Sequence, residues 1–506
     1  MVKKFLYLWS FVKILWDRKP IVIILLLAII PRLFAVVLSK GYGMHDDHFG
    51  PIEQPFQIMH DITYWTSRCE PHGHSIVYPA IHYALFNGLE FIGIKDPQNK
   101  MYIVRFLHAI YSLLIVYFGF KIAKKLSDEN IAKTTGLVLA LFWAFPFLSV
   151  RNLIEVVCIP PLMAGFFYVI SDEEKLRNSL IAGLWFGLAF VFRYQTLAIT
   201  GILGLILLLR KEFKQALLLG CGFLLTAFLI QGSADILAWG YPFASFMEYV
   251  RYNATHGYDY TTGPWYNYAL LVLGALIPPF SFCLVYGLFR NWKKTLLILL
   301  PVLVFFVMHS YFPNKQERFI FPVVPLILML GVIGWEDCVR KSDYWLRHIK
   351  LQKTLWVWFW VINFVLLVPF TGYYTKKARV EAMYTLYGKD VKGIVLVGGK
   401  WGIVQPPLFY ANVYPVPVYQ LQIDDRLGVV GEQIRSVELK PNYAVFFGPE
   451  DIQDRVTRVE QALGCKLVLL REIQPSFLDD VFYRLNPKYN KNQTTFVYEI
   501  RYNSIT

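Results

Sequence analysis

Long apolar runs recur along most of this chain and limit what it can fold into. A run of about 20 apolar residues is long enough to cross the hydrocarbon core of a bilayer as a helix. Hydrophobic residues make up 56% of the chain, which is more than a soluble globular protein carries. These features predict a polytopic α-helical membrane protein with about eleven transmembrane helices. The expected spans lie near residues 20–38, 102–124, 131–149, 154–171, 179–193, 195–210, 215–236, 265–289, 295–312, 319–339 and 354–374.

The charges between the apolar runs predict how the chain is threaded through the membrane. Lys and Arg gather in alternate short connections, as at Lys124, Lys125 and Arg290. Short cytoplasmic loops are rich in these residues, so the N-terminus and these connections are expected on the cytoplasmic side. The same rule accounts for the formal net charge of +14. Membrane lipids, and not nucleic acid, are therefore the expected partners of this basic chain.

Two further segments are expected outside the spans. Segment 78–94 is apolar but contains His82, Asn87 and Glu90, and a span here would break the alternation of loop charge. We therefore expect a helix that lies in the membrane interface, within a first external loop of residues 39–101. The transmembrane domain is expected to end near residue 375.

The last part of the chain, residues 376–506, has a different pattern. Short apolar runs near 393–399, 442–448 and 466–471 are bounded by Gly, Pro or charge, as buried strands are. Residues 449–464 have helical spacing and end in Gly. This pattern predicts a small α/β domain, and the threading puts it on the extracytoplasmic side.

An acidic cluster follows the first span, where Asp46 and Asp47 lie between His45 and His48. A carboxylate beside apolar surface can act as a general base toward a hydroxyl, and a neighbouring histidine can orient it. Asp46 and Asp47 are thus candidates for a general base, and Asp47, His45 and His48 are candidates for positioning an acceptor or a cation. A bound divalent cation and a merely solvated loop are the alternatives. The spacing matches no recognised set of metal ligands, so no metal site is assigned and no cofactor is certain.

Further polar groups face the same extracytoplasmic side in this threading. Ionisable residues at membrane depth are costly and mark functional sites by default. Basic groups there suit a lipid phosphate, and aromatic faces suit a sugar ring. Helix caps, snorkelling arginines, a charged hairpin and an aromatic belt are the structural alternatives. The candidates are Asn152 and Glu155 for positioning the acceptor or a cation, Arg193, Lys315 and Arg318 for the donor phosphate, and Gln195, Trp265, Tyr266 and Glu317 for sugar or lipid contacts.

Five motifs, in order along the chain, resemble those of the family 22 glycosyltransferases of the GT-C superfamily. That family includes the GPI-anchor mannosyltransferases and those that extend dolichol-linked oligosaccharide. Asp46 and Asp47 lie in the counterpart of the family's H-P-D-E-x-x-Q loop, and His74 begins the counterpart of R-S-x-x-Y-P. Asn152 and Glu155 correspond to S-N-x-x-E. The last two motifs are residues 260–268, against Y-G-T-H-P-W-x-W-Y, and residues 313–322, against P-H-K-E-x-R-F-x-x-P.

The resemblance implies an inverting glycosyltransferase that uses a polyprenyl-phosphate sugar, with Asp46 as the first-loop base. We expect it to move a hexose, with mannose favoured, to a glycan or glycolipid acceptor. Gly50, Gly263 and Asn314 replace a Gln and two His of the family motifs, so the sugar and the acceptor stay open. A GT-C enzyme that transfers another sugar to protein or lipid A is one alternative.

A transporter or flippase of lipid-linked sugars is the alternative from another class. Transporters keep charged groups near the bilayer midplane and show internal repeats, whereas the charges here lie toward one face and no repeat is visible. This pattern favours the enzyme. We expect an extracytoplasmic active site in a multi-pass protein, with a bacterial inner membrane favoured over the endoplasmic reticulum.

Overall fold

The computed structural model describes residues 13–61, 63, 71, 73–423 and 427–502. It divides into two compact units. The helical unit comprises Met1–Val36, Trp65–Ala80 and Val104–Thr371. The sheet unit comprises Val37–Tyr64, Ile81–Ile103 and Gly372–Thr506.

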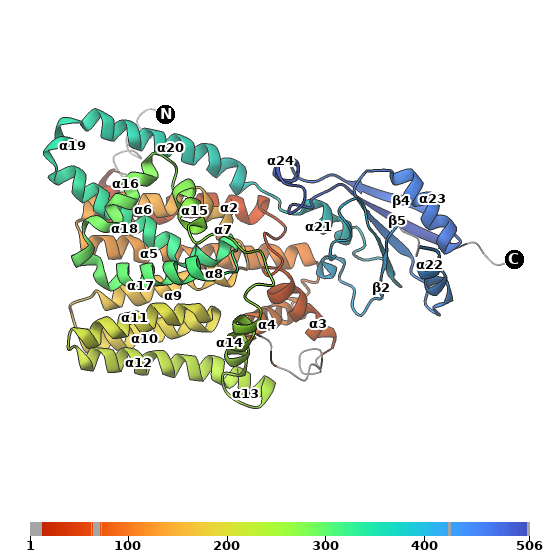
Figure 1. Cartoon of the computed structure of the whole chain (residues 1–506), viewed down its shortest axis with the longest axis horizontal. Helices are drawn as coiled ribbons and strands as arrows, with labels where there is room; N and C mark the ends of the chain where they lie inside the picture. Colours follow the sequence, from red (N-terminus) through yellow and green to blue (C-terminus); the bar gives the residue numbers. More distant parts are fainter. Residues whose placement is uncertain (1–12, 62, 64–70, 72, 424–426, 503–506) are drawn as a thin grey trace. The chain divides into compact units, whose positions relative to one another are not determined.

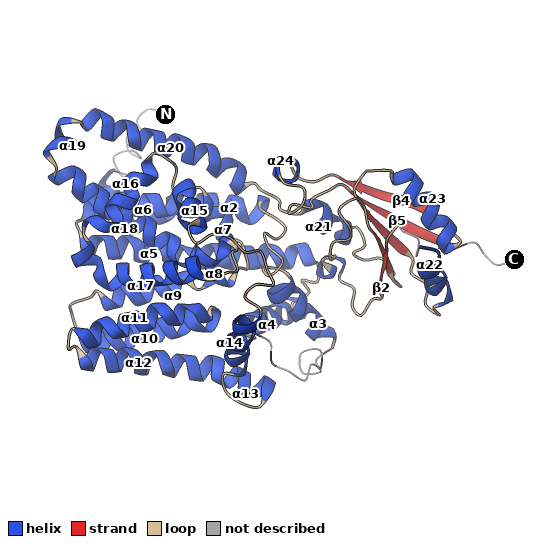
Figure 2. Ribbon diagram, in the orientation of Figure 1, coloured by secondary structure: helices blue, strands red, loops and turns tan. Residues whose placement is uncertain are grey.

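The helical unit is a bundle of helices joined by short connections (Figures 1 and 2). Its first helices are α2 (Pro20–Leu38), α5 (Pro97–Leu126, from Val104 on), α6 (Glu129–Leu141), α7 (Ala144–Leu148), α8 (Ile154–Val157), α9 (Ile159–Val169), α10 (Lys175–Phe192), η3 (Tyr194–Thr196) and α11 (Leu197–Leu209). The next are α12 (Phe213–Thr226), η4 (Ala227–Gly232), α13 (Ser233–Trp239), α14 (Ala244–Thr255), α15 (Asn267–Ala275) and α16 (Phe280–Arg290). The last are α17 (Trp292–Tyr311), η5 (Glu317–Val323), α18 (Val324–Lys341), α19 (Asp343–Arg347) and α20 (Ile349–Thr371). Helix α4 (Val77–Phe91) belongs to the sheet unit from Ile81 on.

The predicted multi-pass membrane protein is confirmed, but the predicted number of spans is not. Among the described residues, six helices are long and apolar enough to cross a membrane. The number becomes seven if α15 and α16, which are bent by 111°, form one broken span. Other expected spans correspond to shorter apolar helices, including Ile154–Val169 and Tyr194–Leu209. Helix α4 has 15 residues and is not among the six, and its expected place in the interface stays a prediction.

Glycines bring helices of this unit into close contact. A Cβ atom added at Gly222 of α12 would lie 2.3 Å from the carbonyl oxygen of Leu180 in α10, and one at Gly183 would lie 2.2 Å from that of Leu219. At Gly334 of α18, it would lie 1.9 Å from the carbonyl oxygen of Gly287 in α16. Small residues let helix backbones approach in membranes, where helices gain little from the hydrophobic effect. Larger side chains at these positions would push the two helix pairs apart.

Polar side chains hold the interruption between α6 and α7. Arg32 Nη1 donates to the carbonyl oxygen of Ala140 at 2.9 Å. Asn363 Nδ2 donates to the carbonyl oxygen of Leu141 at 2.8 Å, and its Oδ1 accepts from the amide of Trp143 at 2.9 Å. Backbone groups that leave a helix at membrane depth must find partners within the protein. These bonds keep the helix interrupted at a fixed point beside the cavity described below.

The sheet unit contains a five-stranded sheet in the order β2-β1-β3-β5-β4 (Figure 2). Strand β1 runs parallel to β2 and β3, whereas β5 is antiparallel to β3 and β4. The predicted strands near 393, 442 and 466 are confirmed as β1, β3 and β4, and the predicted helix as α23, so the α/β domain is confirmed. The elements are η1 (Phe49–Glu53), α3 (Gln54–His60), α21 (Lys377–Tyr384), β1 (Ile394–Val397), η6 (Leu408–Ala411), β2 (Val418–Leu421), α22 (Leu427–Ser436), β3 (Tyr443–Phe447), α23 (Ile452–Leu463), β4 (Cys465–Ile473), α24 (Phe477–Leu485) and β5 (Thr495–Tyr502).

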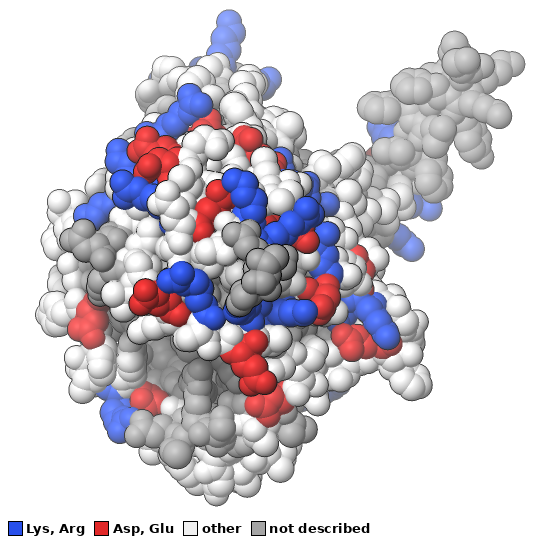
Figure 3. Space-filling view, turned by 90° about the vertical axis from the view of Figure 1, so that its right-hand side faces the viewer, with Lys and Arg blue, Asp and Glu red and all other residues white. Residues whose placement is uncertain are grey.

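Several exposed charges of the sheet unit form ion pairs. Arg458 lies 3.0 Å from Asp454 within α23, and Lys466 lies 3.0 Å from Glu460. Figure 3 shows basic and acidic side chains interspersed on the face that it views, with no extended area of one sign.

Parts of the first external loop belong to the sheet unit. Ser39 Oγ donates to the carbonyl oxygen of Tyr373 at 3.0 Å, and Tyr384 Oη donates to Asp96 Oδ2 at 2.7 Å. Gly41, with φ +75°, forms a bridge to Thr375, and a Cβ atom there would lie 1.8 Å from the Thr375 carbonyl oxygen. The sequence-based division instead joined loop 39–101 to the transmembrane domain and began the second domain at residue 376.

Candidate active site

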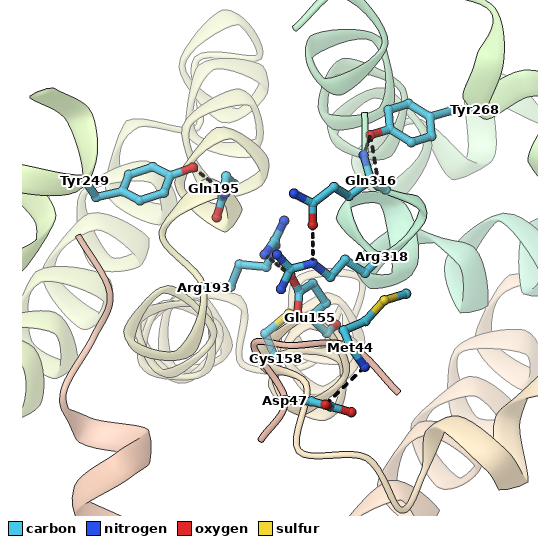
Figure 4. Close-up of polar contacts among 10 residues, drawn as sticks. All are labelled: Met44, Asp47, Glu155, Cys158, Arg193, Gln195, Tyr249, Tyr268, Gln316 and Arg318. Atoms are coloured by element: carbon cyan, nitrogen blue, oxygen red, sulfur yellow. Dashed lines mark hydrogen bonds and ion pairs between the residues drawn. The ribbon is translucent and has the colours of Figure 1, made fainter. Parts of the chain in front are cut away.

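Two arginines converge on one buried carboxylate in the helical unit (Figure 4). Arg193 Nη1 donates to Glu155 Oε1 at 2.7 Å, and Arg318 Nη1 lies 3.4 Å from the same oxygen. All three side chains are buried. Two guanidinium groups thus meet one carboxylate in a place shielded from water. Guanidinium groups suit oxyanions, so this place suits an anionic ligand.

Short, interrupted helices bring these side chains inward. Glu155 lies in the four-residue α8, and Pro160 follows at the start of α9, where a missing N–H costs little. Arg193 ends α10 with extended backbone, φ −146° and ψ 107°, which turns its side chain out of the helical path. Arg318 lies in the 3-10 helix η5, between α17 and α18. Each charged group therefore lies beside a break in a helix.

Arg193 keeps donor groups for a further partner. Its buried Nε and Nη2 atoms have no hydrogen-bond partner within the described part of the chain, and neither has Oε2 of Glu155. Nε and Nη2 form one edge of the planar guanidinium, the edge that binds two oxygens side by side. The ring of Phe319 lies 5.3 Å from the Arg193 guanidinium centre and 5.4 Å from that of Arg318. This edge can bind an oxyanion.

Lys315 directs its ammonium group toward the end of α17. Nζ donates to the carbonyl oxygens of His309 at 3.0 Å and Ser310 at 2.8 Å, and also to that of Phe312. Burial lowers the pKa of the Lys315 ammonium. A lysine that satisfies the last carbonyls of a helix stabilises its C-terminus. This geometry favours a structural role, and the donor-phosphate contact of Lys315 stays a prediction.

The two motifs at 260–268 and 313–322 lie side by side. The amide of Lys315 donates to the carbonyl oxygen of Thr261 at 2.8 Å, and Thr262 forms a bridge with Asn314. Tyr268 Oη donates to the carbonyl oxygen of Gln316 at 3.0 Å. Sequence reasoning treated these motifs separately, because nothing in their spacing shows that they pair.

The other predicted residues of this unit differ in their surroundings. Gln195 Nε2 donates to Tyr249 Oη, as Figure 4 shows, and Asn152 is buried. Trp265 and Tyr266 are exposed, and the Trp265 ring stacks on Tyr311 with centroids 6.5 Å apart. Glu317 is exposed at the start of η5. The contacts of Gln195, Trp265, Tyr266 and Glu317 with sugar or lipid stay predictions, as does the positioning role of Asn152.

A cavity of about 260 Å³ with mainly apolar walls lies within the helical unit. Val156 and Ile159 line it from α8 and α9, and Ile320 lines it from η5. The same short elements α8 and η5 carry Glu155 and Arg318 of the ion cluster. The two elements therefore present charged groups to the cluster and mainly apolar side chains to the cavity, which Glu317 of η5 also lines.

The two carboxylates of the acidic loop, which lies in the sheet unit, have different surroundings. Asp47 is buried, and it accepts from the amide of Gly43 at 2.7 Å and from that of Met44 at 3.1 Å. Asp46 is partly exposed and His45 is exposed. The Asp47 carboxylate shapes the turn by binding two backbone N–H groups, whereas Asp46 keeps access to solvent.

His48 is buried within the sheet unit. Its Nε2 lies 3.0 Å from Glu53 Oε2, and its ring stacks between Tyr42 and Tyr410 at centroid distances of 4.7 and 5.4 Å. Glu53 also accepts from the amide of Phe409 at 3.0 Å. These contacts favour a structural role for His48, and its predicted role in positioning an acceptor stays a prediction. The contacts of Glu53 were not predicted, because its partner Phe409 lies far away in the sequence.

A possible metal site was also considered. Among the residues that the structure describes, no group of three or more His, Cys, Asp or Glu side chains is arranged to hold a metal ion. The divalent cation that the sequence allows therefore has no residue set assigned to it.

The chain matches a known family over most of its length. Residues 22–390 match the Alg9-like mannosyltransferase family. The chain belongs to this family. The match includes both the loop with Asp46 and the cluster of Glu155, Arg193 and Arg318, and it confirms the resemblance to family 22 glycosyltransferases.

Relatives of the chain carry mannosyltransferase names. GPI alpha-1,2-mannosyltransferase 3 of Homo sapiens is 22% identical over 376 residues, which are 71% of this chain and 64% of that protein. Alpha-1,2-mannosyltransferase ALG9 of Mus musculus is 32% identical over 164 residues, 29% of this chain and 27% of that protein. The chain thus spans just under two thirds of the human relative. Both relatives are eukaryotic, so the expected preference for a bacterial inner membrane gains no support.

A solved structure shares the fold of the whole chain. ArnT from Cupriavidus metallidurans, in a crystal structure bound to undecaprenyl phosphate, matches with a TM-score of 0.62. The match covers 94% of this chain and 97% of ArnT at 13% sequence identity. At this identity the likeness shows the fold alone, and it confirms the predicted GT-C architecture with its C-terminal α/β domain.

Proposed function

We propose that this protein is a membrane mannosyltransferase that moves mannose from a polyprenyl-phosphate donor to a glycan or glycolipid acceptor, with inversion at the sugar. Membership of the Alg9-like family and the names of its relatives support the sugar and the reaction. The binding of undecaprenyl phosphate by ArnT, which has the same fold, supports a lipid phosphate as the donor's carrier.

The observation that carries the proposal is that α8 and η5 both hold residues of the charged cluster and line the cavity. On one face Arg193 and Arg318 bring two guanidinium groups to a single carboxylate, and Arg193 keeps an open donor edge. On the other face lies the apolar cavity of about 260 Å³. An apolar cavity of about 150 Å³ takes up benzene, so this one has room for a short length of hydrocarbon chain. A donor with a phosphate head and an isoprenoid tail offers both chemistries.

The proposed chemistry follows from the charge of such a donor. The acceptor hydroxyl attacks the anomeric carbon as the bond between that carbon and the phosphate oxygen breaks. Polyprenyl phosphate leaves with the electron pair, and Arg193 and Arg318 stabilise its charge. The hydroxyl proton passes to Asp46 as general base. Asp46 suits this role better than Asp47, because Asp47 is buried and bound to backbone amides.

The direct test uses the purified full chain in lipid nanodiscs. It is incubated with polyprenyl-phosphate mannose, with the glucose counterpart, and with a panel of mannose-terminated glycolipid acceptors. We expect release of polyprenyl phosphate only with the mannose donor and an acceptor present. The anomeric configuration of the product, read by NMR, should be opposite to that of the donor. A flippase would move the donor across the bilayer with no release, and that result would contradict the proposal.

Variants assign the roles. Asp46→Asn should lower kcat by at least about 10²-fold with an unchanged unfolding temperature, because a positioned general base contributes about 10² to 10⁴. Arg193→Lys keeps the charge but loses the donor edge, and should lower kcat/KM about 10- to 100-fold, as expected for one lost charge-assisted hydrogen bond. Arg210→Lys, at the exposed end of α11, is the matched control and should have no effect. Near-normal transfer by Asp46→Asn would exclude that residue as the base.

A further inference from the structure

Helix α24 exposes large apolar side chains on one face. Phe477 and Leu485, at its two ends, are 79% and 76% exposed, and Tyr489, just beyond it, is 63% exposed. Residues four apart share a face of a helix, so Phe477, Val481 and Leu485 form one apolar stripe. Contiguous apolar surface often marks an interaction site, whereas single exposed apolar side chains are common and carry no such meaning.

The opposite side of α24 is fixed by a buried carboxylate. Asp479 is completely buried and accepts from Tyr373 Oη at 2.7 Å, from Asn492 Nδ2 at 3.0 Å and from the amide of Lys377 at 3.1 Å. Ser476 caps the helix by accepting from the amide of Asp479. A buried carboxylate with this many donors is a rigid anchor. The helix therefore holds one orientation relative to the segment around residue 373.

That segment follows a helix that can span a membrane. Helix α20 is long and apolar enough to span, and it ends at Thr371. Tyr373 is two residues further on, a distance that extended chain covers in at most about 7 Å. The headgroup layer on each side of a bilayer is roughly 6 Å thick, and interfacial helices bury their apolar face by about 5–10 Å. Chain connectivity thus keeps the Tyr373 backbone close to the bilayer surface, and the Tyr373 side chain bonds to the Asp479 anchor.

We propose that α24 lies in the interfacial layer of the same membrane that α20 crosses, with Phe477, Val481 and Leu485 in contact with lipid. The flanking residues have the chemistry of such a helix. Arg484 pairs with Asp480 at 2.9 Å, and the Lys488 ammonium lies 5.6 Å from the Tyr489 ring centroid. Long basic side chains and tyrosine keep a polar tip in the headgroups above an apolar stem. The helix is a second attachment of the sheet unit to the bilayer, and it is independent of the proposed transfer reaction.

The test measures lipid contact at single positions of the full chain. A fluorophore sensitive to polarity is attached to Phe477→Cys or Leu485→Cys, in a background whose native cysteines are replaced by Ser. The control is Val429→Cys on α22, which is 60% exposed and lies at the other end of the sheet unit in Figure 1. The proteins are placed in nanodiscs of phosphatidylcholine and phosphatidylglycerol, with and without lipids that carry a nitroxide near the headgroup.

Emission from positions 477 and 485 should lie at shorter wavelength than emission from position 429 and should be quenched by the nitroxide lipids, whereas position 429 should not be quenched. Quenching at 477 and 485 that does not exceed that at 429 would overturn the proposal. A shift to shorter wavelength without lipid quenching would also overturn it, because it would show that protein, such as a second copy of this chain, covers the stripe.

Discussion

Glu155 holds two arginines at once, so its loss affects more than one ion pair. Glu155→Gln would remove the carboxylate that pairs with both the Arg193 and the Arg318 guanidinium groups. Breaking a buried pair in this way costs about 3–5 kcal/mol, and we expect a clear fall in the thermal unfolding midpoint in detergent. Adding Arg318→Gln should restore part of the loss, with a coupling of about 0.5–3 kcal/mol.

The matched control for this double-mutant cycle of Glu155 and Arg318 is an exposed ion pair. Arg340 lies 2.6 Å from Asp128, with both side chains largely exposed. Asp128 also caps α6, so Arg340→Gln is the appropriate change, and it should alter stability little because exposed pairs contribute about 0–1 kcal/mol. Equal losses for Arg340→Gln and Glu155→Gln, or strictly additive losses in the cycle, would contradict the shared carboxylate.

The ionisation of His45 in the acidic loop should make the stability of the fold depend on pH. Although the side chain is exposed, partial loss of hydration lowers the pKa of its imidazole below the ordinary value of 6.5, and Lys376 and His48 add to the shift while Asp46 and Asp47 oppose it. The unfolded chain therefore binds a proton at a higher pH than the folded chain does. Stability is fully present above pH 6.5 and is lost as the pH falls through the folded pKa. His45→Gln should show a smaller fall in unfolding midpoint between neutral and mildly acidic buffer than the natural chain, and an identical fall would count against this role.

At the residue scale, Glu155, Arg193 and Arg318 could be named as candidates because ionisable residues at membrane depth mark functional sites. The pairing of both arginines with Glu155 was not predicted, because the spacing of three distant residues does not show it. Lys315 and His48 were read as binding groups. Their carbonyl and aromatic neighbours at Ser310 and Tyr410 carry no charge or motif that reveals them.

At the scale of elements, close packing between α10 and α12 depends on Gly222. Gly222→Ala would place a methyl group 2.3 Å from the Leu180 carbonyl oxygen, so the helices must separate, at a cost of about 1–3 kcal/mol. Gly220 lies in the same helix, and an added Cβ atom meets nothing within 4 Å. Gly220→Ala should be neutral or stabilising by up to about 1 kcal/mol, because Ala is the better helix former. Thermal unfolding of the two variants compares them directly, and a similar effect of both would contradict the close contact.

Elements with a clear local sequence pattern were easier to predict than elements whose place depends on pairing with distant strands. Strands β1 and β3 are short, buried and bounded by Gly, and both were found from the sequence. Strand β5 was missed, although Thr495, Val497 and Tyr498 are residues that favour strands. In β5 the charged residues Glu499 and Arg501 alternate with apolar ones, a pattern that an exposed charged segment can also have. The place of β5 between β3 and β4 depends on pairing with residues far away in the sequence. The helix breaks beside Arg32 and Asn363 were missed for the same reason.

At the scale of the whole chain, the sheet unit is built from three separate stretches of sequence. The sheet core around Phe446 and Tyr498 comes from the C-terminal stretch alone. The surroundings of Phe409 come from all three, since its ring lies 5.7 Å from Phe56 and 5.3 Å from Phe86. A domain boundary drawn where the apolar runs end cannot show that three stretches form one unit. Hydropathy indicates whether a segment lies in lipid or in water, but it does not show which segments pack against it.

This difference predicts how a fragment comprising Gly372–Thr506 should behave. The amide of Phe409 donates to Glu53 at 3.0 Å in the full chain, and the fragment lacks that carboxylate. Loss of a hydrogen bond to a charged group, about 1.5–3 kcal/mol, should speed hydrogen exchange at this amide by about 10- to 100-fold. Amides of β3 and β5 should stay protected, because their core is complete within the fragment. Glu53→Ala in the full chain should reproduce the fast exchange at Phe409, and equal protection of this amide in all three proteins would mean that the loop contributes nothing to the unit.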